Sequence, residues 1–145
     1  MRFLPLGVLL AAFVLSAAPA SAQNEYVQQV TRYLEAARSV LSEDGYTRTR
    51  AYTTASLAEG TERTFTFPLQ RNTNYVVTGA CDNDCSDIDF WLYDNNNNLI
   101  DSDTAADDRP VVNVTPARNG TFRLKVRMHG CSSSPCYYGF GIFRQ

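Results

Sequence analysis

The sequence predicts a mainly β fold, namely an antiparallel β-sandwich or jelly roll of about eight strands preceded by one N-terminal α-helix. Apolar residues recur at intervals of three and four before residue 45 and at intervals of two after it. Turn-forming residues interrupt the second pattern about every ten residues, which is typical of sandwiches and jelly rolls. Residues 23–145 have the length of one domain, so a single core is expected.

The first 22 residues predict a signal peptide. Arg2 supplies the positive charge, an apolar run extends from Phe3 to Val14, and Ala20 and Ala22 occupy the small-residue positions before a signal-peptidase cut. Cleavage after Ala22 starts the mature protein at Gln23. No later stretch approaches the roughly 18 uninterrupted apolar residues of a membrane span. We therefore expect a periplasmic or secreted protein without a transmembrane segment.

Residues 23–44 predict one amphipathic helix. Asn24 is a candidate N-cap, and Gly45 is expected to end the helix. The residues that repeat with the helical period are Tyr26, Val30, Tyr33, Leu34, Ala37, Val40 and Leu41.

Residues 45–145 predict the β-sandwich domain, with short strands separated by turns rich in Asn, Asp, Gly and Pro. The candidate strands cover residues 46–56, 63–69, 74–81, 87–93, 98–103, 110–115, 121–129 and 136–144. The expected core residues are Phe65, Phe90, Leu92, Val114, Leu124, Val126 and Phe140.

Two of these strands also predict a charged outer face, because alternate side chains of a strand point to opposite sides. In 87–93 the outward residues are Asp87, Asp89, Trp91 and Tyr93. In 121–129 they are Arg123, Lys125, Arg127 and His129. We expect the acidic and basic residues to pair across neighbouring strands, with a few tenths of a kcal/mol for each pair.

The charge of the chain excludes some partners. Cleavage of the signal peptide removes one of the 13 basic residues and none of the 15 acidic residues, so the mature chain has a net charge of −3. That charge gives no electrostatic case for binding nucleic acid or anionic membranes.

Three segments, SDIDFWLYDNNNNLIDSD, VVNVTPARNGTFRLKVRM and CYYGFGIFR, together resemble the bacterial pre-peptidase C-terminal domain. That family has an Asp-x-Asp-apolar-x-apolar strand, an Asp/Asn/Gly hairpin and a later Gly-Thr-apolar strand. The resemblance covers roughly residues 57–143 and implies a secreted β-sandwich that acts as a non-catalytic binding or maturation module. This chain departs from the family by carrying only a helix in front and by its two cysteine pairs.

The four cysteines, Cys81, Cys85, Cys131 and Cys136, are expected to form disulfides, because an exported chain meets an oxidising compartment. A four-thiolate zinc site is the alternative, but its spacings are loose. Three pairings are open, and loop entropy favours the long-range ones. Loop geometry and the family resemblance favour the local pairs, Cys81 with Cys85 and Cys131 with Cys136.

Alternating strand directions place both cysteine loops and several carboxylates at one end of the predicted sandwich. Oxygen ligands in this number suit Ca²⁺, although no fixed-spacing calcium motif is present and solvated loops are often acidic. The candidate ligands are Asp82, Asp84, Asp87, Asp103, Asp107 and Asp108. The segment from Asp94 imitates the start of an EF-hand loop but has Leu99 and Ala105 where glycine and glutamate are required, so we interpret it as a hairpin turn.

We expect no enzymatic activity. His129 is the only histidine, and neither Gly-x-Ser-x-Gly nor His-Glu-x-x-His occurs. The carboxylates Asp87 and Asp89, about 7 Å apart by strand rise, leave a hydrolase as the weakest alternative. No cofactor is expected apart from Ca²⁺.

The functional prediction is an exported binding or accessory module for polypeptide or carbohydrate. Trp91 and Tyr93 are the candidate ligand-binding residues, because exposed aromatic rings on a sandwich face can stack on sugars or polypeptide. The alternative is a small structural or stress-related protein of the cell envelope whose helix docks a partner.

Overall fold

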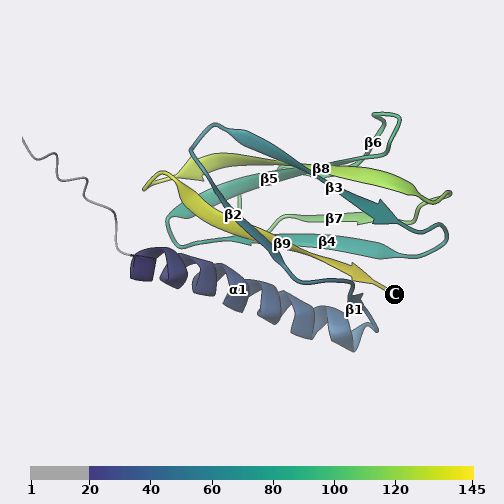
Figure 1. The fold of residues 1–145 in the computed structure, drawn as a ribbon, viewed down its shortest axis with the longest axis horizontal. Helices are drawn as coiled ribbons and strands as arrows, with labels where there is room; N and C mark the ends of the chain where they lie inside the picture. The colour runs from purple at the N-terminus through teal and green to yellow at the C-terminus, as the bar shows by residue number, and fades with distance from the viewer. Residues whose placement is uncertain (1–19) are drawn as a thin grey trace, which may run out of the picture.

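The computed structural model describes residues 20–145, which form one helix and nine strands (Figure 1). Most of the predicted signal peptide, residues 1–19, lies outside the described residues. The elements are α1 (Ala20–Glu43), β1 (Thr47–Arg48), β2 (Thr53–Leu57), β3 (Glu62–Leu69), β4 (Tyr75–Cys81), β5 (Cys85–Tyr93), β6 (Leu99–Asp103), β7 (Val111–Val114), β8 (Gly120–Cys131) and β9 (Cys136–Arg144). The mainly β class with one N-terminal helix is confirmed.

The strands form two antiparallel sheets. The five-stranded sheet has the order β1-β9-β4-β7, with β2 also pairing with β9, and the four-stranded sheet has the order β3-β8-β5-β6. Figure 1 shows the two sheets as layers, with α1 lying along the outer side of the five-stranded sheet. Within residues 20–145 α1 is the only helix, and it is not long and apolar enough to cross a membrane.

The first predicted strand, 46–56, is two strands in the structure, so the total is nine. β1 and β2 both pair with β9, and the chain leaves the sheet between them. Two side chains between β1 and β2 contact other elements of the fold. The Arg50 guanidinium lies 5.4 Å from the centroid of the Phe67 ring, and the Tyr52 hydroxyl donates a hydrogen bond to the Leu34 carbonyl oxygen of α1.

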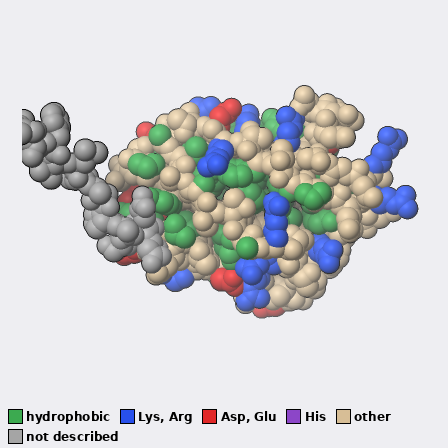
Figure 2. Space-filling model, in the orientation of Figure 1, with side chains coloured by type: hydrophobic (Ala, Val, Ile, Leu, Met, Phe, Trp, Pro, Cys, Tyr) green, Lys and Arg blue, Asp and Glu red, His purple; other side chains and the backbone are tan. Residues whose placement is uncertain are grey.

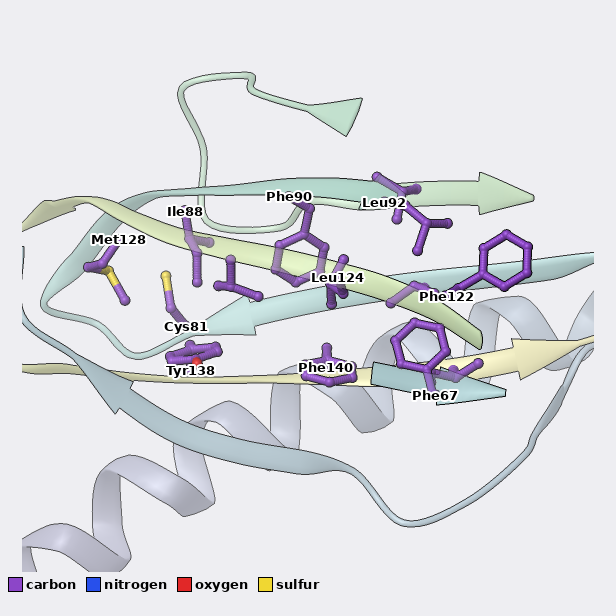
Figure 3. Close-up of a cluster of buried hydrophobic side chains, with 14 of the residues drawn as sticks. Phe67, Cys81, Ile88, Phe90, Leu92, Phe122, Leu124, Met128, Tyr138 and Phe140 are labelled. Atoms are coloured by element: carbon purple, nitrogen blue, oxygen red, sulfur yellow. The ribbon is translucent and has the colours of Figure 1, made fainter. Parts of the chain in front are cut away.

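One hydrophobic cluster contains buried side chains from both sheets (Figure 3). At its centre, the Phe140 ring of β9 lies 5.0 Å from the Phe65 ring of β3 and 6.4 Å from the Phe90 ring of β5. The predicted core residues are buried except Phe65 and Val114, which are only partly covered. These two belong to β3 and β7, which end their respective sheets and therefore lack a neighbouring strand on one side.

A second, smaller cluster joins α1 to the five-stranded sheet, where Val30 and Leu34 are buried against Ala80. Gly139 of β9 makes this close approach possible. A Cβ atom at this position would lie 2.8 Å from the Thr53 carbonyl oxygen and 3.0 Å from Cγ1 of Val30. The helix therefore rests on a surface that has no room for a side chain.

The C-terminal end of α1 is the predicted one. Gly45 has a φ of 82°, its N–H donates to the Ser42 carbonyl oxygen, and the Tyr46 N–H donates to the Leu41 carbonyl oxygen. This pattern is a Schellman motif. The predicted N-cap is wrong, because α1 begins at Ala20 and Asn24 lies within it. Residues 20–23 contain no glycine or proline, and alanine strongly favours the helix. The local sequence therefore allows the helix to begin before Asn24.

Candidate functional site

Four connecting loops meet at one end of the two sheets, as strand alternation predicted. The Glu59 N–H donates to the Ser134 hydroxyl, and the Glu59 carboxylate accepts a hydrogen bond from the Cys131 N–H, both at 3.1 Å. The Ser132 N–H donates to the Asp84 carbonyl oxygen at 2.8 Å, and the Ile88 N–H to the Asp107 carbonyl oxygen at 3.0 Å. These bonds tie the loops into one surface.

Two disulfides staple this end, Cys81–Cys85 and Cys131–Cys136. The predicted local pairing is confirmed, and all four cysteines of the chain are used. In each pair the Cα atoms are within the usual disulfide range, at 5.8 and 5.9 Å. Structural disulfides indicate folding in an oxidising, extracytoplasmic environment.

Asp82 is the most deeply placed carboxylate of this end, with 1% of its surface exposed. Its side chain accepts hydrogen bonds from the Tyr137 N–H at 2.7 Å and from the Asp84 N–H at 3.1 Å. Burial raises the pKa of Asp82, and these backbone donors oppose the rise. The geometry gives Asp82 a structural role, because both of its carboxylate oxygens are occupied by backbone donors.

Most of the other predicted calcium ligands are occupied in a similar way. Asp103 accepts hydrogen bonds from the N–H groups of Ala105 and Val111, and Asp107 accepts one from the Arg109 N–H. The Asp108 carboxylate lies 3.5 Å from the Arg109 guanidinium. Among residues 20–145, no three His, Cys, Asp or Glu side chains are grouped so as to hold a metal ion.

The last two candidate ligands face different neighbours. The charge of Asp84, followed by burial, raises the pKa of Tyr26 on α1. Asp87 lies on the outer side of β5, where its Oδ1 atom is buried without a hydrogen-bond partner. The six candidate carboxylates therefore share one end of the molecule without converging on one point.

The outer surface of the four-stranded sheet brings Trp91 and Tyr93 together with two cations. Trp91 is opposite Lys125 in the strand register and Tyr93 is opposite Arg123. The Lys125 ammonium lies 4.4 Å from the Trp91 ring centroid, and the Arg123 guanidinium lies 5.7 Å from that of Tyr93. We call these four residues the aromatic–cationic face.

A shallow hollow of about 290 Å³ opens on the aromatic–cationic face. It is lined by Thr64, Tyr93, Asn97, Arg123 and Lys125. Arg123 donates a hydrogen bond to the Asn97 side chain, and Lys125 lies 3.9 Å from the Glu62 carboxylate. The hollow thus combines an aromatic ring, two cations and an amide, which together can hold polar or anionic groups against a flat apolar surface.

The remainder of this sheet face carries the predicted charge row. Asp89 and Arg127 are opposite each other in the register, as expected, although no ion pair joins them. Asp89 is 7% exposed, and burial followed by the charge of Asp87 raises its pKa, while His129 and Arg127 lower it. In the other half of the row, Arg123 and Lys125 lie over aromatic rings, and Lys125 also lies near the Glu62 carboxylate of β3.

Sequence reasoning missed a groove between the two sheets at the end opposite the disulfides. Its volume is about 610 Å³. Arg50 and Arg144 lie at its rim, and the chain order gave no signal that these residues would meet. The buried side chains of its floor are Phe67, Leu69, Tyr75 and Ile142.

Comparison with known proteins does not assign the chain to a group. No protein-family model matches the sequence, and no curated protein is significantly similar to it. The resemblance to pre-peptidase C-terminal domains remains a prediction based on its motifs.

Proposed function

We propose that this protein is an exported, non-catalytic binding or accessory module, built as a β-sandwich that resembles pre-peptidase C-terminal domains. The observation that carries the proposal is the aromatic–cationic face, where Trp91 and Tyr93 lie at alternate positions of β5 and each is paired with a cation of β8. Such a surface fits a polypeptide or carbohydrate ligand that offers a flat apolar face together with acidic or hydroxyl groups.

The experiment is a glycan-array and pull-down screen of the exported protein, followed by the variant Tyr93→Ala. A ligand that uses the face should be lost or strongly weakened by Tyr93→Ala and weakened by Lys125→Gln. Arg118→Gln is a matched control, because Arg118 is an exposed cation outside the aromatic–cationic face. Binding that survives both face variants would disprove the proposal.

The disulfides and the predicted signal peptide support a periplasmic or secreted location. We propose cleavage after Ala22, so that the mature protein begins at Gln23. Amino-terminal sequencing of protein recovered after export tests this directly, and a mature chain that retains residues 1–22 would contradict it.

A second candidate function is that of a cell-envelope protein whose helix docks a partner. It is favoured by an apolar groove of about 390 Å³ between α1 and strands β4 and β7. Val40 on the helix and Val111 on β7 line this groove and are 64% and 41% exposed. Under this alternative, Val40→Asp removes a captured partner while Tyr93→Ala does not.

A further inference from the structure

The groove that Arg50 and Arg144 line, at the end opposite the disulfides, opens onto side chains of the main core. It lies where the C-terminal part of β3 and the C-terminal part of β9 face each other across the two sheets. Phe67 and Leu69 of β3, Tyr75 of β4 and Ile142 of β9 are each almost fully buried, and yet all four line the groove. The floor is therefore continuous with the hydrophobic core.

Two exposed arginines stand at the rim of this apolar floor. Arg50 and Arg144 both line the groove, and none of the ion pairs within residues 20–145 includes either of them. The Arg50 guanidinium rests on the Phe67 ring, 5.4 Å from its centroid. Stacking of this kind holds the guanidinium plane in place and leaves its N–H edge free to donate hydrogen bonds.

The surroundings of the groove add to its positive potential. Arg71 and Arg118, in the loops after β3 and β7, are also exposed and also without an ion pair among the described residues. Figure 2 shows basic side chains projecting at this end of the molecule. The acidic disulfide loops lie at the opposite end, so an anion is attracted to the groove and repelled from the other end.

We propose that this groove binds the anion of a fatty acid. The carboxylate accepts hydrogen bonds from Arg50 and Arg144, and the alkyl chain lies on Phe67, Leu69, Tyr75 and Ile142. The volume of the groove is within the range of roughly 300–1,000 Å³ that small-molecule sites occupy. The site is separate from the aromatic–cationic face, so it is an additional binding activity.

The backbone around the groove favours a small amphiphile over a peptide. A peptide that entered as an extended strand would need free main-chain donors and acceptors. Pro68 on β3 has no N–H, and the Ile142 carbonyl oxygen on β9 already accepts bonds from the N–H and hydroxyl of Thr49 at 2.9 and 3.0 Å. β3 is an edge strand, but Pro68 leaves it without a main-chain donor at this position, so the groove offers its arginine donors and apolar floor to a small amphiphile and no continuous strand edge to a peptide.

Isothermal titration of the exported protein with decanoate, kept below its micelle concentration, tests the proposal. We expect binding of decanoate, but none of 1-decanol, which lacks the charge, and none of acetate, which lacks the chain. Arg50→Gln and Arg144→Gln should each weaken binding roughly tenfold, since each removes a charged donor pair. Arg50→Lys should retain part of the affinity, and Arg118→Gln, outside the groove lining, should retain nearly all of it.

Several results would overturn the proposal. The first is the absence of decanoate binding, and the second is equal binding of decanoate and 1-decanol. The third is an equal loss of decanoate affinity in Arg118→Gln and Arg144→Gln, because it would show that only the general positive potential matters. Binding of an apolar peptide through its free C-terminal carboxylate, without binding of decanoate, would also refute the fatty-acid assignment. Melting curves of each variant establish that the altered protein is folded.

Discussion

The carboxylate of Asp82 accepts a 2.7 Å hydrogen bond from the Tyr137 N–H, while the Asp82 N–H donates to the Tyr137 carbonyl oxygen at 2.9 Å. Asp82 follows Cys81 in the chain, and Tyr137 follows Cys136. Asp82 thus lies inside one disulfide loop, and Tyr137 lies on β9 directly after the other. The side chain adds a further hydrogen bond beyond the β4–β9 ladder, whose last paired residues are Cys81 and Tyr138.

Replacement of this carboxylate should be costly. In Asp82→Asn, one of the two oxygens becomes an NH₂ donor, so either the Tyr137 N–H or the Asp84 N–H loses its acceptor at a buried site. We expect a loss of about 1–3 kcal/mol in the free energy of unfolding, measured in urea. The control Asp108→Asn removes only an exposed contact with Arg109 and should cost less than about 1 kcal/mol. Equal stability of the two variants would contradict the role of Asp82.

Gly139→Ala should loosen α1 from the five-stranded sheet. The added methyl group would meet the Thr53 carbonyl oxygen at 2.8 Å and the side chains of Val30 and Leu34 at 3.0 and 3.2 Å. We expect a loss of about 1–3 kcal/mol, as for other overpacked sites, and faster hydrogen exchange in the helix. Gly120→Ala is the matched control, because its nearest neighbouring atom would be 3.9 Å away. An unchanged exchange rate in α1 would disprove the tight contact.

Most of the strands could be predicted because each buries one face and exposes the other. β8 shows this alternation clearly, whereas all seven residues of β4 are buried. The helix covers the outer face of β4, so this strand shows no alternation of buried and exposed residues. The position of β4 could therefore be recognised only from the turns on either side of it. The split between β1 and β2 had no local signal, because it depends on contacts of Arg50 and Tyr52 with residues distant in sequence.

The candidate sites were less predictable than the fold. The outward direction of Trp91 and Tyr93 follows from strand alternation, but their cationic neighbours depend on the register between β5 and β8. The groove of Arg50 and Arg144 depends on how two sheets stack and on where β1 ends. Such arrangements are set by long-range packing, which has no period in the sequence.

Two aspartates of β6 should protect the edge of the neighbouring sheet. Asp101 and Asp103 accept hydrogen bonds from the N–H groups of Asn113 and Val111, at 2.7 and 2.9 Å. β7 ends the five-stranded sheet, so these groups would otherwise be open to another chain. We expect the double variant Asp101→Ala, Asp103→Ala to aggregate at protein concentrations where the parent does not, measured by light scattering.

The control for this prediction is the double variant Glu43→Ala, Asp44→Ala, which also removes two exposed carboxylates, at the end of α1 and directly after it. If both variants scatter equally, loss of negative charge explains the aggregation and the proposed edge protection is wrong. If neither aggregates, the N–H groups of β7 do not need these acceptors.

The contribution of Asp89 to the stability of the fold should fall as pH rises through the folded-state pKa of this residue. Burial raises that pKa, so the folded protein holds the proton more tightly than the unfolded chain and loses this advantage when the carboxyl ionises. Asp82 contributes in the same direction. Compared with the parent, Asp89→Asn should therefore lose less stability as pH rises above about 4, the ordinary aspartate pKa, measured as the urea midpoint.

Asp94 provides a comparison of opposite sign. Hydrogen bonds from Asn98 lower the pKa of Asp94, so its contribution is present above the unfolded pKa and is lost as pH falls. Compared with the parent, Asp94→Asn should therefore lose more stability, or gain less, as pH rises through the same range. A steeper profile in Asp89→Asn, or an unchanged one, would show that burial does not control the titration of Asp89.

The end of the molecule that carries the disulfides and the candidate calcium ligands should bind calcium weakly or not at all. The carboxylates of Asp82 and Asp103 already accept two backbone hydrogen bonds each, and a Ca²⁺ ion needs six to eight oxygen ligands, so coordination would sacrifice existing bonds. We expect the melting midpoint in millimolar calcium to agree within about one degree with the midpoint in chelator, since a ligand stabilises the fold only when its concentration approaches Kd.

The variants Asp84→Asn and Asp107→Asn decide the meaning of any calcium effect. Asp84 and Asp107 lie in two of the loops that meet at the disulfide end, so a site formed there would require oxygens from both. Repulsion among crowded carboxylates is the force that a bound dication would relieve, and Ca²⁺ is the ion that oxygen ligands favour. A rise in midpoint that both variants abolish would establish a calcium site at this end and refute the expected indifference. A rise that neither variant alters would place the ion elsewhere in the molecule. It would also contradict the prediction that calcium leaves the melting midpoint unchanged.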